Sequence, residues 1–396
     1  MTRETAARPP TRRSTRWWLG AAGAVIAVAM TGCAGGDRDV LSTRVEAPPD
    51  ASVVRMLAVT TRKGSTSDPA VYAGERGREI AQIEFAVSIP PVAGRKVGEV
   101  IWPSGAVPDP TREFAVVDRV EHSRDSARAW FHRTGNGRAL IFVHGFNTRF
   151  DDAVFRFAQF VHDSRTPFTP ILFSWPSRGK VTQYIYDRES TNYSRDALEA
   201  LLRGAIADPD VKEISILAHS MGTWLTMETL RQMAIRDGGI APKVHDVILA
   251  APDIDGDVFR RQIARLGSPR PRVSLFVSRD DRALDISRLI AGDVARAGNI
   301  DPTDADWKDT LEKANVHVFD LTAVDTPDRL RHGKFAADGD VVRLIGDRLV
   351  AGHSITDSRV GIGDRVGGVV SGTFGAVGGV AGAVVGAPLA VLGQTP

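Results

Sequence analysis

The chain has 396 residues, with 50 lysines and arginines against 48 aspartates and glutamates. This near balance excludes a nucleic-acid binder that depends on a strongly basic surface, which needs a local excess of positive charge. Hydrophobic residues make up 43% of the chain, which excludes a wholly disordered protein. The single cysteine, Cys33, excludes a disulfide scaffold and a cysteine-based zinc site.

The first 33 residues have the pattern of a targeting segment. Several arginines precede an uncharged stretch from Trp17 to Met30, and Thr31-Gly32-Cys33 follows. A positive start, a short apolar core and a small-residue exit are typical of a secretory signal. The ending resembles a bacterial lipobox, in which Cys33 is lipidated; an ordinary signal with a chance cysteine is the alternative. We therefore expect residues 1–33 to be a lipoprotein-type signal peptide and the mature protein to be exported and membrane-anchored in the cell envelope.

Residues 34–52 are polar and rich in glycine and proline, which predicts a tether between lipid and domain. Short β-rich runs broken by prolines follow, and they predict a β-rich front section over residues 53–135. The runs are Val53–Thr60, Gln82–Ile89, Lys96–Trp102 and Glu113–His122.

From Ala139 onwards, apolar strands alternate with helices. Strands of this kind are typical of a parallel sheet that is covered on both faces, so we expect an α/β domain over residues 53–355 with a mostly parallel sheet. The expected strands are Ala139–Val143, Ile171–Trp175, Glu213–Ala218, Val244–Ala250, Arg272–Val277 and Val316–Leu321. The expected helices are Asp151–Asp163, Asn192–Ile206, Met221–Arg236, Asp255–Arg265, Arg282–Ala291 and Asp340–Val350.

The strongest functional signal is Ala218-His219-Ser220-Met221-Gly222, which follows an apolar strand and opens a helix. This is the setting of a nucleophile elbow, with a serine at the apex of a tight turn. Small residues are needed two positions before and after the serine, and Ala218 and Gly222 satisfy that need. We predict that Ser220 is a catalytic nucleophile; a serine N-cap is the simpler alternative.

His144-Gly145-Phe146-Asn147 follows the strand Ala139–Val143 and supports this interpretation. In proteins with a nucleophile elbow, the loop after a neighbouring strand supplies one backbone N–H that binds the oxyanion of the reaction, and the residue after the serine supplies the other. We assign these backbone groups to Phe146 and Met221. His144 and Asn147 are candidate substrate-lining residues, although a structural role that holds the loop is the favoured interpretation of His144.

In proteins with a nucleophile elbow, the serine comes first in the chain, the acid second and the histidine third, so few residues can be the catalytic acid and base. His332 lies in the loop between the last strand and the closing helix and is our predicted base. Its alternatives are His317, inside a strand, and His353, beyond the closing helix. Our predicted acid is Asp281 at the end of a strand, where a helix cap is the simpler role. Asp280 and Asp253 stay open as alternative acids.

The segment from Ser177 to Ser194 contains three of the four tyrosines of the chain. Tyr184 and Tyr186 within it are further substrate-lining candidates, because aromatic side chains commonly line pockets or lids. An equally good interpretation is that these tyrosines only pack a long loop against the rest of the protein.

Several of these motifs together resemble the bacterial α/β-hydrolases known as DUF900, a family without a defined substrate. The resemblance covers residues 53 to 350 and includes Val143–Thr148, Phe173–Ser177, Ala218–Gly222, Ala251–Asp255, Ser278–Leu284 and His332–Phe335. It implies an α/β-hydrolase fold and strengthens the assignment of the site residues, but it barely narrows the reaction.

We therefore expect a serine esterase or lipase that cleaves a carboxylic ester, thioester or amide through Ser220, His332 and Asp281. A small-molecule or lipid ester is the expected substrate, and no metal, organic cofactor or nucleic acid is implied. The alternatives are a catalytically weak scaffold with a hydrolase fold and a membrane-anchored protein that handles lipids.

The C-terminal tail, residues 356–396, is rich in glycine, alanine and valine, and no charge occurs after Arg365. Glycines at four-residue spacing permit close helix packing in a membrane. A disordered low-complexity tail, membrane association or self-assembly, and packing on the domain all stay open.

Overall fold

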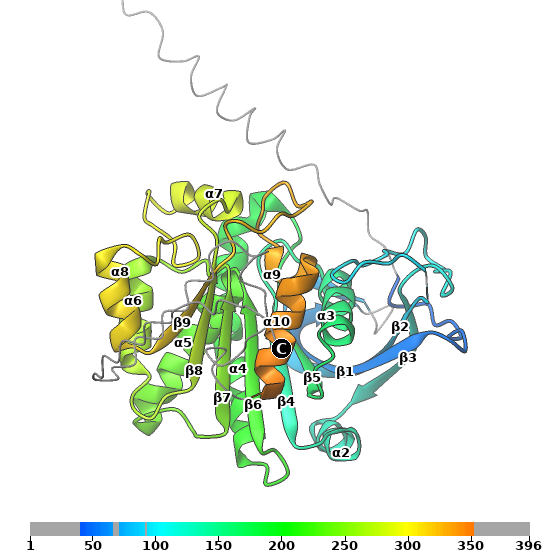
Figure 1. Ribbon diagram of the computed structural model, residues 1–396. Helices are drawn as coiled ribbons and strands as arrows, with labels where there is room; N and C mark the ends of the chain where they lie inside the picture. Colours follow the sequence, from blue (N-terminus) through cyan, green and yellow to red (C-terminus); the bar gives the residue numbers. More distant parts are fainter. Residues whose placement is uncertain (1–39, 66–70, 92, 352–396) are drawn as a thin grey trace, which may run out of the picture.

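The computed structural model describes residues 40–65, 71–91 and 93–351, which form one mixed sheet with helices on both faces (Figure 1). The strand order is β3-β2-β1-β5-β4-β6-β7-β8-β9. The strands are β1 (Ser52–Gly64), β2 (Tyr72–Ile89), β3 (Ala115–His122), β4 (Arg138–Val143), β5 (Thr169–Ser174), β6 (Glu213–His219), β7 (Val244–Ala250), β8 (Arg272–Val277) and β9 (Val316–Asp320).

The sheet is mostly parallel, as predicted. β1 pairs in parallel with β5, and every pairing from β5 through β4 to β9 is parallel. Only β2 runs against its neighbours β1 and β3. The β-rich front section therefore extends the main sheet at one edge, and the carboxyl ends of the parallel strands meet at a common edge, where ligands bind in such sheets.

Helices cover both faces of this sheet. The 3-10 helix η1 (Val181–Gln183) leads into α4, and α3, α9 and α10 lie on the face opposite α4 and α5. The helices are α2 (Arg124–Thr134), α3 (Phe150–Ser164), α4 (Tyr184–Ala207), α5 (Met221–Asp237), α6 (Gly256–Arg265), α7 (Arg282–Ile290), α8 (Ala305–Lys313), α9 (Lys334–Ala337) and α10 (Gly339–Ala351).

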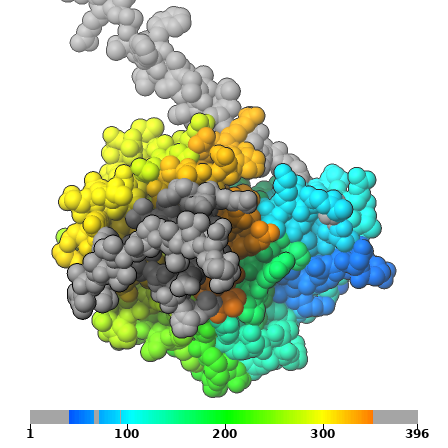
Figure 2. Space-filling view, in the orientation of Figure 1, coloured from blue at the N-terminus to red at the C-terminus, as the bar shows by residue number. Residues whose placement is uncertain are grey.

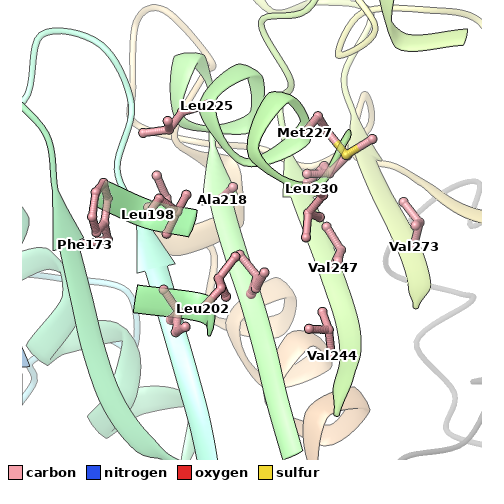
Figure 3. Packing of buried hydrophobic residues seen from close by; sticks show 14 of the residues in the cluster. Phe173, Leu198, Leu202, Ala218, Leu225, Met227, Leu230, Val244, Val247 and Val273 are labelled. Atoms are coloured by element: carbon pink, nitrogen blue, oxygen red, sulfur yellow. The ribbon is translucent and has the colours of Figure 1, made fainter. Parts of the chain in front are cut away.

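Two hydrophobic cores result because alternate residues of each strand point to opposite faces. In β4, Ile141 and Val143 join the core beneath α4 and α5, whereas Leu140 and Phe142 join the core beneath α3 and α10. Figure 3 shows the first core, in which Leu198 of α4 and Leu225 of α5 lie over Ala218 of β6. This double burial explains why apolar residues dominate the central strands.

Several predicted elements differ from the structure. Lys96–Trp102 is not a strand: Glu99 N–H donates to the carbonyl oxygen of Lys96 at 3.0 Å and Gly98 has φ +90°, so the segment turns instead of extending. The predicted helix Asn192–Ile206 begins eight residues earlier, at Tyr184, and so absorbs much of the expected loop. Helices α2 and α8 lie outside the helices expected from the sequence; α2 buries Ala127, Trp130 and Phe131, and α8 buries Trp307 and Leu311.

The later part of the predicted tether lies against the domain. Val40 and Leu41 are buried, and the Val45 N–H donates to the carbonyl oxygen of Val116 at 3.1 Å. The predicted signal peptide with Cys33, residue His353 and the tail from residue 356 lie outside the described residues. Within the described part of the chain, no helix has the length and apolar character needed to cross a membrane.

Candidate active site

Ser220 sits at a sharp turn between β6 and α5, with φ +52° and ψ −124°. This left-handed backbone conformation is strained for a residue with a side chain and is characteristic of functional turns. Three backbone hydrogen bonds hold it: Ser220 N–H donates to Ala250 at 2.9 Å, and its carbonyl oxygen accepts from Thr223 at 2.9 Å and Asp253 at 3.3 Å. The structure thus has the strand–turn–helix geometry that the sequence predicts.

Two glycines let the loop after β4 approach this turn. A Cβ on Gly222 would lie 2.3 Å from the carbonyl oxygen of His144, and a Cβ on Gly145 would lie 2.8 Å from Cβ of Ser220. Either contact is too short for any larger residue. The small residues around the serine are therefore required by close packing between the two loops.

His332 and Asp281 form a hydrogen-bonded pair beside this turn. Nδ1 of His332 lies 2.7 Å from Oδ2 of Asp281, whose side chain is fully buried. The ring centroid of His332 lies 4.7 Å from that of His219, the residue immediately before Ser220. Nε2 of His332 and Oγ of Ser220 make no hydrogen bond to another described residue.

The electrostatic surroundings favour the charged form of His332. Burial, the largest single effect, works to lower the pKa of His332. The charge and hydrogen bond of Asp281, followed by the charges of Asp253 and Asp328, outweigh it and raise that pKa above its ordinary value of 6.5. An imidazolium formed during a reaction is therefore stabilised at this position.

The two alternative acids have other partners. Oδ1 of Asp280 accepts from Ser278 Oγ at 2.5 Å and Lys334 Nζ at 2.8 Å, and its Oδ2 accepts from Arg331. Burial works against ionisation of Asp280, but these three donors lower its pKa to about 2.

Asp253 accepts from the hydroxyl groups of Tyr184, at 3.0 Å, and Ser287, at 2.5 Å. It also faces Arg296 at 3.3 Å. Of the three candidate acids, Asp281 is the one that the structure brings into contact with His332.

Two residues that sequence analysis did not identify shape the loop of His332. The carboxylate of Asp328 accepts from the backbone N–H groups of Leu330 at 2.9 Å, His332 at 2.8 Å and Gly333 at 3.0 Å. Lys334 is buried, and its ammonium group donates to Asp280 and to the carbonyl oxygen of Leu321 at 2.9 Å. No sequence motif marks Asp328, and Lys334 lies in the segment His332–Phe335 without a role that the sequence alone assigns.

The predicted oxyanion donors lie at the junction of the same loops. Among the described residues, the backbone N–H groups of Phe146 and Met221 donate no hydrogen bond to another group. Met221 is also the first residue of α5, where the partial positive charge of the helix N-terminus favours a developing anion. These N–H groups are thus free to bind an oxyanion.

His144 is enclosed by protein groups. Its ring stacks on Trp175 at a centroid distance of 4.9 Å, and its Nε2 lies 3.3 Å from Nη2 of the buried Arg62. Because an arginine can only donate, Nε2 accepts and Nδ1 donates to Gly145 O at 2.9 Å. Burial and then the charge of Arg62 lower the pKa of His144 to about 3. The neutral ring therefore supports the loop, and neither nitrogen is free for a substrate.

The tyrosines of the predicted lining segment lie in α4. Tyr184 is buried, its hydroxyl contacts Asp253, and its ring packs on Phe146 at a centroid distance of 5.3 Å. Burial, the strongest effect, and Asp253 raise its pKa to about 12. Tyr186 lies between Arg178 and Arg76, with guanidinium carbons 3.7 and 4.7 Å from its ring centroid. Both aromatic rings are thus held by protein contacts.

A cavity of about 1330 Å³ borders the site on the α3 and α10 side of the sheet. It lies between the loop that carries Gly145 and Asn147 and the loop that carries Gly333 and Phe335, with His219 between them. Ser220 and His332 themselves do not line it. Of the candidate lining residues, His144 and the exposed Asn147 border this cavity, whereas Tyr184 and Tyr186 do not.

One group in the described part of the chain has the spacing of metal ligands. His132 Nε2 lies 2.9 Å from Asp208 Oδ2, and His132 Nδ1 lies 3.4 Å from Asp210 Oδ2. Arg128 also donates to Asp208, at 2.7 Å. These contacts make an ion-pair cluster at the surface, distant in the fold from Ser220, and we assign no metal to it.

Comparison with known proteins relates the chain to hydrolases. A family model described as "Alpha/beta hydrolase of unknown function (DUF900)" matches residues 123–348. An uncharacterized protein of Nostoc sp. is 44% identical over 62 residues, a match that spans 15% of this chain and only 16% of that protein.

Solved structures similar to the chain include an esterase of Pyrobaculum calidifontis, with 10% identity and a TM-score of 0.34 over 76% of this chain and 85% of that one. Carboxyl esterase 2 of Tuber melanosporum has 11% identity and a TM-score of 0.35 over 85% of this chain and 98% of that one.

Proposed function

The chain belongs to the DUF900 family of α/β-hydrolases and has the α/β-hydrolase fold, and from this premise we propose that it is a serine hydrolase that cleaves carboxylic esters. The observation that carries the proposal is the hydrogen bond between His332 and Asp281 beside the strained turn of Ser220. A buried acid that fixes an imidazole next to an unengaged serine is the arrangement that activates a nucleophile.

In the proposed reaction, Ser220 Oγ attacks the acyl carbon while its proton passes to Nε2 of His332. Asp281 holds the Nδ1–H and so keeps the lone pair on Nε2. The carbonyl oxygen, now an oxyanion, accepts from the N–H groups of Phe146 and Met221. His332 then returns the proton to the leaving alcohol, and a water molecule repeats the sequence to release the acid and restore Ser220.

A fluorophosphonate probe tests this proposal without knowledge of the substrate, because it reacts only with activated serines. We expect the wild type to be labelled and Ser220→Ala to be unlabelled. Ser123→Ala is the matched control, since Ser123 is an exposed serine that only caps α2, and it should be labelled like the wild type. Absence of labelling in the folded wild type would reject the proposal.

We also propose that the protein is a lipoprotein held at the membrane through Cys33. The support is the arginine-rich start, the short apolar stretch and the position of the only cysteine at the end of that stretch. A lipid-modified cysteine would incorporate a labelled fatty acid, and Cys33→Ser should lose the label. A wild type that incorporates none would contradict the proposal.

A further inference from the structure

The cavity beside Ser220 is formed where segments far apart in the chain meet. A Cβ on Gly98 would lie 2.3 Å from the carbonyl oxygen of Ala337, and Arg156 Nη1 donates to the carbonyl oxygen of Gly98 at 3.0 Å. In Figure 2 the cyan surface near residue 100 and the orange surface of residues 325–350 lie beside each other. The loop between β2 and β3 thus forms one wall of the cavity, and the segment after His332 forms the facing wall.

The cavity reaches the immediate neighbours of the proposed nucleophile. Gly145 and His219 line it, and both lie against Ser220: one through close packing of the two loops, the other as the preceding residue. His219 also donates from Nε2 to the carbonyl oxygen of His332 at 3.2 Å. An ester held at Ser220 therefore has this space directly beyond Gly145 and His219.

The walls of the cavity offer mainly apolar surface. The apolar side chains include Val97, Val100 and Trp102 of the β2–β3 loop, Phe142 of β4, and Phe335 and Ala337 of α9.

Several charged residues that also line the cavity already bind protein groups. Arg95 pairs with Asp163, Asp328 accepts three backbone N–H groups, and Asp338 accepts from the first residues of α10. These charges contribute to holding the walls together, whereas Lys96, Glu99, Asp325 and Arg343 also line the cavity and are exposed. The apolar side chains named above are the part of the lining that suits an apolar chain.

We propose that this cavity binds the acyl chain of a fatty acyl ester whose carbonyl group lies at Ser220, an inference that rests on the proposed function. Its volume of about 1330 Å³ exceeds the ~300–1,000 Å³ of ordinary small-molecule pockets, so a chain of medium or greater length can enter. Each methylene that becomes buried adds up to about fourfold in binding, the factor that ~0.8 kcal/mol represents.

A chain-length series with p-nitrophenyl acetate, butyrate and octanoate tests the proposal. For the wild type we expect kcat/KM to rise by at least about tenfold from acetate to octanoate. Ala337→Trp places a large ring at a half-buried position that lines the cavity, and it should remove that gain, so that the ratio of kcat/KM for octanoate to kcat/KM for acetate falls to about one.

The matched control is Ala197→Trp. Ala197 is also half-buried and lines a separate cavity of about 730 Å³ on the other face of the sheet, beneath α4. This variant should keep the chain-length preference of the wild type. An unchanged preference in Ala337→Trp, or an equal loss in Ala197→Trp, would overturn the proposal.

Binding without hydrolysis separates this proposal from the proposed function. Ser220→Ala should bind dansyl-labelled undecanoate, dodecanoate should displace it, and adding Ala337→Trp should weaken binding at least about tenfold. If the wild type resists fluorophosphonate and hydrolyses no ester but Ser220→Ala binds the probe in this way, the proposed function fails and the cavity assignment stands. If fluorophosphonate labels Ser220 but this variant binds no probe, the cavity assignment fails.

Discussion

Nδ1 of His332 donates a hydrogen bond of 2.7 Å to Oδ2 of Asp281, and the other oxygen of that carboxylate accepts from the backbone N–H of Leu284 at 3.0 Å. Asp281 therefore has both of the roles weighed for it from sequence, the cap of α7 and the partner of the histidine. The cap fixes the carboxylate, and the fixed carboxylate orients the ring.

This double role makes Asp281→Asn an informative change. Asparagine is as good an N-cap as aspartate, so α7 and the stability of the fold should be kept. The amide, however, can donate to Nδ1 and so favour the tautomer with its proton on Nε2, which cannot accept from serine. We expect kcat/KM for an activated ester to fall by about 10³-fold or more with little change in the midpoint of chemical unfolding.

Asp280→Asn and Asp253→Asn are the matched controls for that prediction. Asp280 pairs with the buried Lys334, so its loss should lower the free energy of unfolding by about 1–3 kcal/mol and lower activity much less than Asp281→Asn does. Asp253→Asn should also be the milder change for activity. If either control costs more activity than Asp281→Asn, the acid is assigned to the wrong carboxylate.

The strained backbone at Ser220 predicts that substitutions there abolish activity but keep or raise stability. Ser220→Ala should reduce activity at least about 10³-fold and leave stability close to that of the wild type, because alanine keeps the Cβ at φ +52°. Ser220→Gly should be equally inactive but more stable than Ser220→Ala by about 1 kcal/mol, since glycine accepts this backbone conformation without strain. Urea unfolding measures the difference, and equal stability of the two variants would show that the turn stores no strain.

The parts of the fold that sequence analysis predicted correctly share a strong local signal. β4 and β6 are buried on both faces and contain the apolar runs Ala139–Val143 and Ile216–Ala218, and the turn at Ser220 needs glycine at Gly222. Helix α2 gives little signal, because only Ala127, Trp130 and Phe131 of its residues are buried.

The supporting contacts of the site could not be read from the chain because they join distant positions. Arg62 of β1 lies 82 residues before His144, whose Nε2 it contacts, and Lys334 lies 54 residues after Asp280. The hydrophobic periodicity of a short segment carries no information about a contact between residues so far apart in the chain. Ser220, Asp281 and His332 could be proposed from the sequence, whereas the contact between Asp281 and His332 and the side chains around them required the structure.

The raised pKa of His332 predicts the pH dependence of the reaction. A general base must be neutral, so kcat/KM should rise with pH through the pKa of His332, at a midpoint above its ordinary value of 6.5. Asp328 contributes to that shift by its negative charge, so Asp328→Asn should move the midpoint to lower pH. The midpoint of the pH profile does not depend on the fraction of enzyme that is active. A variant that is only partly folded would therefore show a lower rate and not a shifted midpoint. An unchanged midpoint would show that the charge of Asp328 does not act on His332.

The lowered pKa of His144 predicts that the protein becomes less stable as the pH falls. In the unfolded chain a histidine binds a proton near pH 6.5, whereas the buried ring, with its pKa of about 3, stays neutral. The unfolded state therefore binds more protons as pH falls below 6.5, and the folded state loses up to ~1.4 kcal/mol of stability per pH unit from this group. His332, whose pKa is raised, acts with the opposite sign, and His219, whose pKa is lowered, acts with the same sign.

His144→Asn isolates this contribution. The asparagine amide can still donate to the carbonyl oxygen of Gly145 but does not titrate, so the variant should be less stable than the wild type at pH 7 because the ring no longer packs on Trp175. Its stability should nevertheless fall less steeply between pH 6.5 and pH 5, by about 1 kcal/mol per unit. Urea unfolding at several pH values in this window gives both slopes. Parallel slopes for the two proteins would mean that His144 takes up a proton in the folded state, and that the enclosed, neutral ring described above is wrong.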